Sequence, residues 1–249
     1  MESPRAEHEI AHGRKLSESG AEQVWGWGSL AGQKRFHRRA SWIAQHAGLK
    51  SDIYALEIGC GTGNFTESFA MSGANLLALD ISEDLLKLAR ERHLPSTVDF
   101  ICQPIETLDM PETFDAIIGS SVLHHLEISS SLKMIYRLLK PGGIIAFAEP
   151  NMLNPQIMLQ KNIPWIKKRV GDSPDETAFY RRQIQSLLKQ TGFELIEVTP
   201  LDWLHPAIPA RAIALFQRIE FYFENIPLLC EFAGSLYISA RRPLRPGVT

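Results

Sequence analysis

The chain has 249 residues, 45% of them hydrophobic and 22% charged, which is typical of a folded domain and excludes a disordered or coiled-coil protein. Its 26 basic and 28 acidic residues give a formal net charge of -2, which argues against a dedicated nucleic-acid-binding protein. No apolar run approaches the length of a bilayer-spanning helix, and no apolar signal sequence is visible. With three widely spaced cysteines and no CxxC pair, we expect a cytoplasmic location.

The first 50 residues are predicted to form an amino-terminal cap that ends in one helix, from about residue 33 to 47. Its apolar face carries residues spaced by four, three and four positions: Phe36, Ala40, Ile43 and Ala47. We expect the basic residues of its other face to be solvated: Lys34, Arg35, His37, Arg38 and Arg39. Trp25 and Trp27 precede the helix and are expected to form either a lid over a ligand or a small core.

Strands alternate with helices through residues 51–150. Short apolar segments predict strands at 53–58, 75–79, 98–102, 114–120 and 144–149, with helices at 64–72, 83–92 and 130–139. Two further strands are expected at 194–199 and 234–240, after a helix at 176–190. The alternation predicts an α/β fold with a Rossmann-like, doubly wound, mostly parallel sheet of seven strands and helices on both faces.

Two segments, 151–175 and 204–231, are too long for ordinary connections, and loops of that length are usually functional. We therefore expect one domain over residues 1–249, in which both insertions lie over the substrate side of the core at 51–150. The second insertion has a helical apolar face, which we expect to pack mostly on the sheet: Ile208, Ala212, Leu215, Ile219, Tyr222 and Ile226. Glu220 and Glu224 are expected on the opposite side. A lid, a dimer face or a peripheral membrane contact through 204–231 are the alternatives for the apolar face.

A glycine-rich loop with the spacing GxGxG, formed by Gly59, Gly61 and Gly63, lies between a predicted strand and a predicted helix. Such glycines allow a tight turn, and the helix start offers free N–H groups to a ligand. Glu57 precedes the loop, and Asp80 ends the next strand, where an acceptor for ribose hydroxyls is expected. A pyrophosphate would be repelled by Glu57, so a ligand with an amine, a carboxylate and a ribose fits better than a dinucleotide.

Four linked segments resemble the motifs of class I S-adenosylmethionine-dependent methyltransferases. They are LEIGCGTG at 56–63, LLALDIS at 76–82, FDAIIGSSVLHHL at 114–126 and LLKPGGIIAFAEP at 138–150. Within that family they look most like the ubiquinone/menaquinone-biosynthesis type. The resemblance implies S-adenosylmethionine as cofactor, S-adenosylhomocysteine as product, and methylation of a small-molecule or lipid-like acceptor at an undecided O, N or C atom.

The same resemblance implies roles for individual residues. Glu57 would hold the methionine amine through water, and Asp80 would bind both ribose hydroxyls. The glycine loop, with Cys60 in it, would line the methionine and ribose, Ile81 would pack on the adenine, and Ser120 would lie beside the methionine end. Pro104 fills the position where many relatives have an aspartate for the adenine amino group. The Ile105 backbone N–H can still bond the ring, with Glu106 or Gln103 as acceptor.

Three histidines are candidate general bases, because a general base works best when its pKa is near the working pH, and histidine is the residue type whose ordinary pKa lies closest to neutral pH. His124 and His125 follow the fourth strand at the edge where ligands of α/β sheets bind, and His205 begins the second insertion. Glu149, at the end of the fifth strand, is a comparable candidate. No metal-ligand pattern stands out, so we expect no metal.

Other functions are weaker alternatives. Tyr136 and Lys140 have the Tyr-x-x-x-Lys spacing of NAD(P)-dependent short-chain oxidoreductases, but the glycine loop does not fit that family. Because Pro104 replaces the aspartate that many relatives use to bind adenine, a non-catalytic S-adenosylmethionine-binding module is another alternative. The sequence leaves open whether the chain is a monomer or a homodimer.

Overall fold

One mixed sheet organises the molecule in this computed structural model, which describes residues 4–245. Its seven described strands run in the order β3-β2-β1-β4-β5-β7-β6, and only β7 pairs antiparallel with its neighbours. The strands are β1 Tyr54–Ile58, β2 Asn75–Asp80, β3 Val98–Cys102, β4 Phe114–Ser120, β5 Leu139–Pro150, β6 Glu194–Leu201 and β7 Ser235–Arg241. The predicted doubly wound sheet is therefore confirmed.

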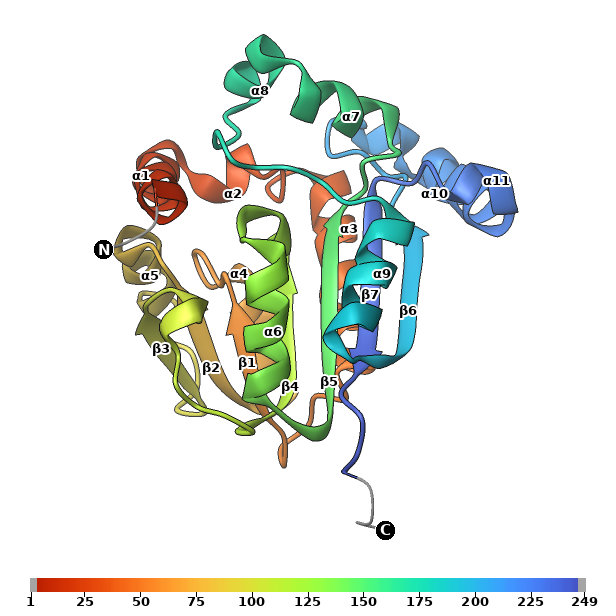
Figure 1. Ribbon diagram of the computed structural model, residues 1–249. Coiled ribbons are helices and arrows are strands. Elements are labelled where there is room, and N and C mark those ends of the chain that lie inside the picture. Colours follow the sequence, from red (N-terminus) through yellow and green to blue (C-terminus); the bar gives the residue numbers. More distant parts are fainter. Residues whose placement is uncertain (1–3, 246–249) are drawn as a thin grey trace.

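Helices cover both faces of the sheet and its upper end (Figure 1). The α-helices are α1 Pro4–Ser19, α2 Ala21–Val24, α3 Leu30–His46, α4 Asn64–Ala70, α5 Glu83–Arg90, α6 Ile128–Leu138, α7 Pro155–Asn162, α8 Pro164–Val170, α9 Arg181–Thr191, α10 Ile213–Asn225 and α11 Pro227–Cys230. Short 3₁₀ turns are η1 Ile105–Thr107, η2 Leu123–His125 and η3 Ala210–Ala212. Within residues 4–245 no helix is both long and apolar enough to cross a bilayer.

Two apolar layers hold these helices on the sheet. On one face α6 packs on β5 and α9 packs on β6, and the two helices bury Leu132, Ile135 and Leu188 in one apolar cluster. On the other face α3 and α4 bury Ile43 and Phe69. Because alternate residues of a strand point to opposite faces, the buried parallel strands supply both layers at once.

Helix α1 was not among the predicted elements, although apolar or small residues recur along it at a helical spacing: Ala6, Ile10, Gly13 and Leu16. It packs on α5 through Gly13, since a Cβ there would lie 2.5 Å from the hydroxyl oxygen of Ser82. The fit brings the amino-terminal segment to the carboxyl ends of β1 and β2. The amino-terminal cap is thus mostly helical and closes one side of the sheet edge (Figure 1).

The prediction that the apolar face of 208–226 packs on the sheet is wrong. Leu215 and Tyr222 are 59% and 66% exposed, whereas Glu220 is only 9% exposed. Glu220 accepts the backbone N–H groups of Trp203 and Leu204, at 2.8 and 3.3 Å. Helix α10 therefore docks through its acidic side, because those backbone donors and the basic face of α3 need partners there.

The expectation that the basic face of α3 is solvated is also wrong for Arg38 and Arg39, in the middle of the helix. Arg38 forms a two-bond ion pair with Glu224, at 2.7 and 2.8 Å, and lies 3.1 Å from Glu220. Arg39 is 2% exposed and bonds Asp202 of the β6–α10 connection at 2.9 Å. Only the tertiary contact with the second insertion supplies these acids, so the local sequence suggested a solvated stripe.

Candidate active site

A cavity of about 1190 Å³ opens at the carboxyl ends of the parallel strands, and residues of α7 and of the β6–α10 connection line it. Residues from the cap, the core and both insertions line it. They include Glu9, Trp25, Gly59, Asp80, Ser120, His125, Glu176 and His205. Ligands of α/β sheets bind at this edge, so the structure brings most of the predicted site residues to one place.

The glycine loop adopts the backbone that its sequence predicts. Gly59, Gly61 and Gly63 all have positive φ, of 66°, 54° and 77°, a region that side-chain-bearing residues rarely adopt. A Cβ at Gly59 would lie 2.4 Å from the Val122 side chain, so the loop leaves room only for glycine there. Trp25 lies over Gly61 and lines the cavity, and Trp27 packs against Phe65 and also lines the cavity. That the two tryptophans form a lid stays a prediction, with a small core as its alternative.

Glu57 lies beneath the loop and is 1% exposed. Its Oε2 atom has no hydrogen-bond partner, and burial raises the pKa of its carboxyl to about 8. A buried carboxyl oxygen without a hydrogen-bond partner costs free energy, unless a bound ligand supplies the missing partner. Glu57 does not itself line the cavity, so a cationic amine would reach it most simply through water, in keeping with the role that the resemblance implies.

Asp80 lines the cavity at the end of β2, and both of its carboxylate oxygens accept backbone N–H groups at 2.8 Å, from Gly61 and Ser82. Burial raises the pKa of Asp80, and those two hydrogen bonds oppose the rise. Each oxygen keeps a free lone pair, because a carboxylate oxygen accepts two hydrogen bonds. Ile81 follows it on the cavity wall, in position to pack on a flat ring.

At the far end of the cavity, Pro104 has extended backbone and starts η1, so that Ile105 is 1% exposed. Glu106 lines the cavity, and its carboxylate accepts the Ser131 hydroxyl of α6 at 2.8 Å. Gln103 lines the cavity beside it. Both candidate acceptors for an adenine amino group are therefore within the same wall, and Glu106 is already oriented by α6.

A buried polar network beside Ser120 was missed by sequence reasoning. Arg39 donates to the hydroxyls of Ser121, at 3.0 Å, and Ser120, at 3.4 Å, besides Asp202 and Ser235. Asp202 also accepts the Tyr237 hydroxyl at 2.9 Å. These partners lie up to 196 positions apart along the chain, so no local pattern indicates the network.

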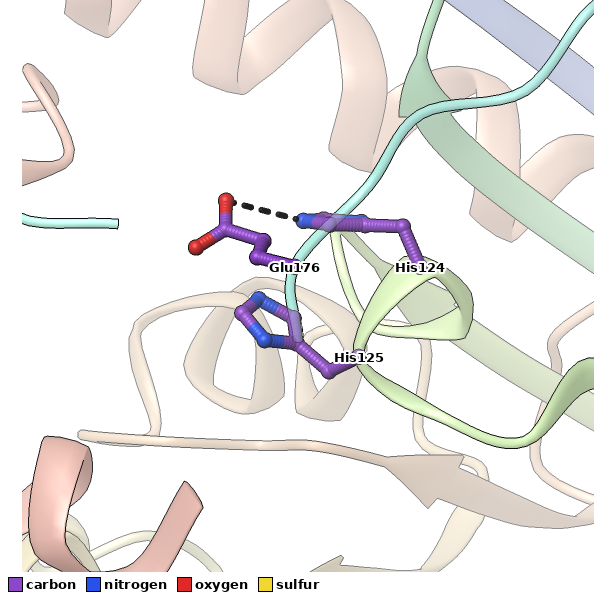
Figure 2. Close-up of side chains that lie close together, drawn as sticks. All are labelled: His124, His125 and Glu176. Atoms are coloured by element: carbon purple, nitrogen blue, oxygen red, sulfur yellow. Dashed lines mark ion pairs between the residues drawn. The ribbon is translucent and has the colours of Figure 1, made fainter. Parts of the chain in front are cut away.

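The rings of His124 and His125 lie side by side, with centroids 4.2 Å apart, and both face Glu176, which follows the first insertion (Figure 2). His124 is buried, with Nδ1 2.6 Å from Glu149 and Nε2 3.4 Å from Glu176. Burial lowers the pKa of His124, but its hydrogen bonds to the two carboxylates outweigh this and raise the pKa to about 8. His124 is therefore mostly protonated at neutral pH and poorly suited to accept a proton.

His125 lines the cavity and is 21% exposed, and its Nδ1 lies 2.9 Å from the carboxylate of Glu9 in α1. Its other ring nitrogen faces the Glu176 side (Figure 2). Burial raises the pKa of Glu9, but its contact with His125 lowers it below the usual value. This contact is an ion pair by distance and not a hydrogen bond, because Nδ1 has no hydrogen-bond partner. A carboxylate beside one ring nitrogen still leaves the other nitrogen as a candidate general base.

The ligand atoms of His124, His125 and Glu176 lie within 4.8 Å of one another, a spacing that suits a metal ion. Metal ligation needs deprotonated nitrogens, however, and His124 is held in its charged form. The Lys161 ammonium contacts Glu176 and lies 2.7 Å from Asp172. The absence of a metal from the reaction stays a prediction.

His205 lines the cavity from the second insertion. Its Nδ1 accepts the Ala207 backbone N–H at 3.1 Å, and its Nε2 lies 2.9 Å from the side-chain amide nitrogen of Gln156, which is also a donor. Burial, together with the nearby charge of Arg35, lowers the pKa of His205. Since both ring nitrogens already face N–H donors, His205 is less available than His125 to take a proton from an acceptor.

Tyr136 and Lys140 lie outside this cavity. Tyr136 packs against Phe193 and Arg242, and Lys140 pairs with Asp115 at 2.7 Å. The oxidoreductase spacing in the sequence therefore has no counterpart in the site.

Comparisons with known proteins agree with this geometry. Residues 56–147 match the family model described as a methyltransferase domain. The chain is 35% identical over 126 residues to the ubiquinone biosynthesis O-methyltransferase of Bordetella bronchiseptica, covering 49% of this chain and 52% of that protein. It thus spans about half the length of the curated relatives it matches.

Two solved structures share the fold over most of the chain. The Haloferax volcanii putative methyltransferase, solved in complex with the Trm112 methyltransferase activator, has a TM-score of 0.69 at 16% identity, over 93% of this chain and 97% of that one. The Haemonchus contortus phosphoethanolamine N-methyltransferase 2, in complex with S-adenosyl-L-methionine, has a TM-score of 0.60 at 18% identity, over 83% and 52%.

Proposed function

We propose that the chain is a class I S-adenosylmethionine-dependent methyltransferase that transfers a methyl group from this cofactor to a small-molecule or lipid-like acceptor; the match of residues 56–147 to the methyltransferase-domain model supports this. The observation that carries the proposal is the shared cavity. In it a glycine loop of positive φ and the carboxylate of Asp80 face the His125–Glu9 pair across one enclosed space.

The cofactor supplies an electrophilic methyl group, and the protein's main task is to align the acceptor and exclude water. Asp80 and the glycine loop hold the cofactor, and Glu57 binds the amine of the cofactor through a water molecule. His125, oriented by Glu9, takes the proton of an acceptor hydroxyl or amine. The α1 segment and the two insertions exclude solvent from the cavity that they line.

A screen with S-adenosylmethionine labelled in its methyl group tests the proposal. Lipid, sugar and phenolic pools are incubated with the protein, and label is sought in each. We expect label in a small-molecule or lipid pool and none in nucleic acid. Binding of S-adenosylhomocysteine without any labelled product would favour the non-catalytic binding module, and nicotinamide binding in its place would favour the oxidoreductase.

Glu57→Gln is expected to abolish the proton release that accompanies S-adenosylhomocysteine binding. At pH 7 the Glu57 carboxyl is mostly protonated, because its folded pKa is raised to about 8. A bound ammonium group favours the carboxylate, so the wild type should release close to one proton and bind more tightly as the pH rises toward 8. Calorimetry in two buffers with different heats of ionisation measures the release, with exposed Glu91→Gln as the control. Equal heats in both buffers for the wild type would contradict the assignment.

His125→Ala is expected to lower kcat by about 100-fold on the best acceptor from the screen, since a positioned base contributes about this much. Glu9→Gln should lower kcat by a smaller factor, because it only orients the ring. His37→Ala, on the exposed side of α3, is the control and should match the wild type. A loss after His205→Ala that exceeds the loss after His125→Ala would reverse the assignment of the base.

We also propose that residues 1–249 act as one methyltransferase domain, with the segments 151–175 and 204–231 over the substrate side. Three free thiols, Cys60, Cys102 and Cys230, support a cytoplasmic location. Peripheral membrane contact through 204–231 stays a prediction, supported by exposed Phe221 and Leu228 in α10 and α11. A homodimer through the same apolar face is its alternative.

A further inference from the structure

Arg35 lies on the wall of the cavity where α3 faces the second insertion. Its guanidinium stacks on the Trp27 ring, 5.1 Å from the ring centre, and its side chain is 21% exposed. Its Nε atom is buried and has no hydrogen-bond partner. A planar, always charged donor with free N–H groups is well suited to bind a carboxylate or another oxyanion.

The Arg35 Nε atom has no carboxylate within hydrogen-bond distance. Asp202 is 3.8 Å from the Arg35 Nε, and it already accepts bonds from Arg39, Ser235 and Tyr237. Glu220 also acts on Arg35 through its charge, but it lies 3.1 Å from Arg38. Burial, together with the neighbouring Arg39 charge, lowers the pKa of Arg35 to about 10. A buried charge that lacks a full partner is unfavourable, so this position favours the entry of an anion.

Arg35 lies on the acceptor side of the cavity rather than on the cofactor side. Its neighbours Trp27 and Asp202 come from the cap and from the start of the second insertion, and its charge acts on His205 of that insertion. Arg39, one turn later in α3, is the arginine that bonds Ser120 at the end of β4. Arg39 is buried and does not line the cavity, so Arg35 is the arginine of α3 that a ligand in the cavity can reach.

We propose that Arg35 anchors an oxyanion, such as a carboxylate, of the methyl acceptor. The inference rests on the proposed function and narrows its substrate class: the acceptor carries a negative charge, and it lies between Trp27 and the loop that contains His205. Arg35 holds the acceptor by this group while the atom to be methylated points toward the cofactor.

Acetate is the probe for this site, because it is the smallest stable carboxylate and enters a cavity of any shape. The unfolding midpoint is measured while sodium acetate replaces sodium chloride at constant ionic strength, with and without saturating S-adenosylhomocysteine. We expect a saturable rise of roughly 3 °C for the wild type at a tenfold excess over the acetate Kd. Arg35→Met should lose this rise, and Arg35→Lys, which keeps the charge and the helix, should need severalfold more acetate. Arg218→Met removes the same charge from the exposed side of α10 and should behave as the wild type.

The affinity for S-adenosylhomocysteine separates the two sources of a carboxylate. If Arg35 binds the acceptor, Arg35→Met should keep this affinity within threefold of the wild type. A loss of more than tenfold, with no acetate effect once S-adenosylhomocysteine is bound, would assign the carboxylate to the cofactor and overturn the proposal. An equal acetate response of the wild type and Arg35→Met would also overturn it. Failure of the wild type to bind S-adenosylhomocysteine would count against the proposed function alone, because the acetate titration without it still tests the anion site.

Discussion

Replacing Asp80 by alanine is expected to weaken S-adenosylhomocysteine binding by more than tenfold. Its carboxylate lies at the end of β2 with two backbone N–H groups on it and free lone pairs toward the cavity. Hydrogen bonds to a charged group contribute about 1.5–3 kcal/mol each, so the loss of even one ribose contact exceeds a tenfold change. The alanine variant also frees the N–H group of Gly61, which loosens the loop that the cofactor would lie on.

Calorimetric titration of S-adenosylhomocysteine measures the effect. Asp99→Ala makes the same change on the exposed side of the neighbouring strand β3 and should leave the affinity unchanged. Asp80→Asn keeps the shape and should lose less than Asp80→Ala, since an amide oxygen still accepts one hydrogen bond. An effect of Asp80→Ala below twofold would mean that the ribose assignment is wrong.

Arg39→Met is expected to lower the free energy of unfolding by about 3–5 kcal/mol, because it leaves the buried Asp202 carboxylate without its main cation. Asp202 and Arg39 are 4% and 2% exposed, so water cannot replace the lost partner. For a chain of this size the unfolding midpoint should fall by roughly 10 °C. Differential scanning calorimetry measures the shift.

The double variant Arg39→Met, Asp202→Asn tests the cause. Removing the carboxylate charge together with its partner should recover part of the loss, since the remaining groups are neutral. Lys34→Met, on the exposed side of the same helix, is the matched control and should shift the midpoint by less than about 2 °C. A fall of less than 3 °C for Arg39→Met would show that the network stabilises the fold little.

The sequence was most informative where cause and effect are local. GxGxG between a strand and a helix requires positive φ at Gly59, Gly61 and Gly63, and an acid after the next parallel strand reaches the same sheet edge. Strand alternation and these motifs predicted the sheet, the cofactor end of the cavity and the position of Asp80. The histidine pair after β4 was also expected at this edge, because parallel strands end together.

What only the tertiary structure decided depends on partners far apart in the chain. The basic face of α3 is buried because Asp202, Glu220 and Glu224 come from the other end of the sequence. Those acids turn α10 so that its apolar side faces outward, opposite to the prediction from its periodicity. Periodicity gives the faces of a helix but not which neighbour each face meets. For the same reason the sequence offered His124 and His125 as equal candidates, and their carboxylate neighbours distinguish them: His124 is buried between Glu149 and Glu176, whereas His125 lies beside Glu9 on the cavity wall.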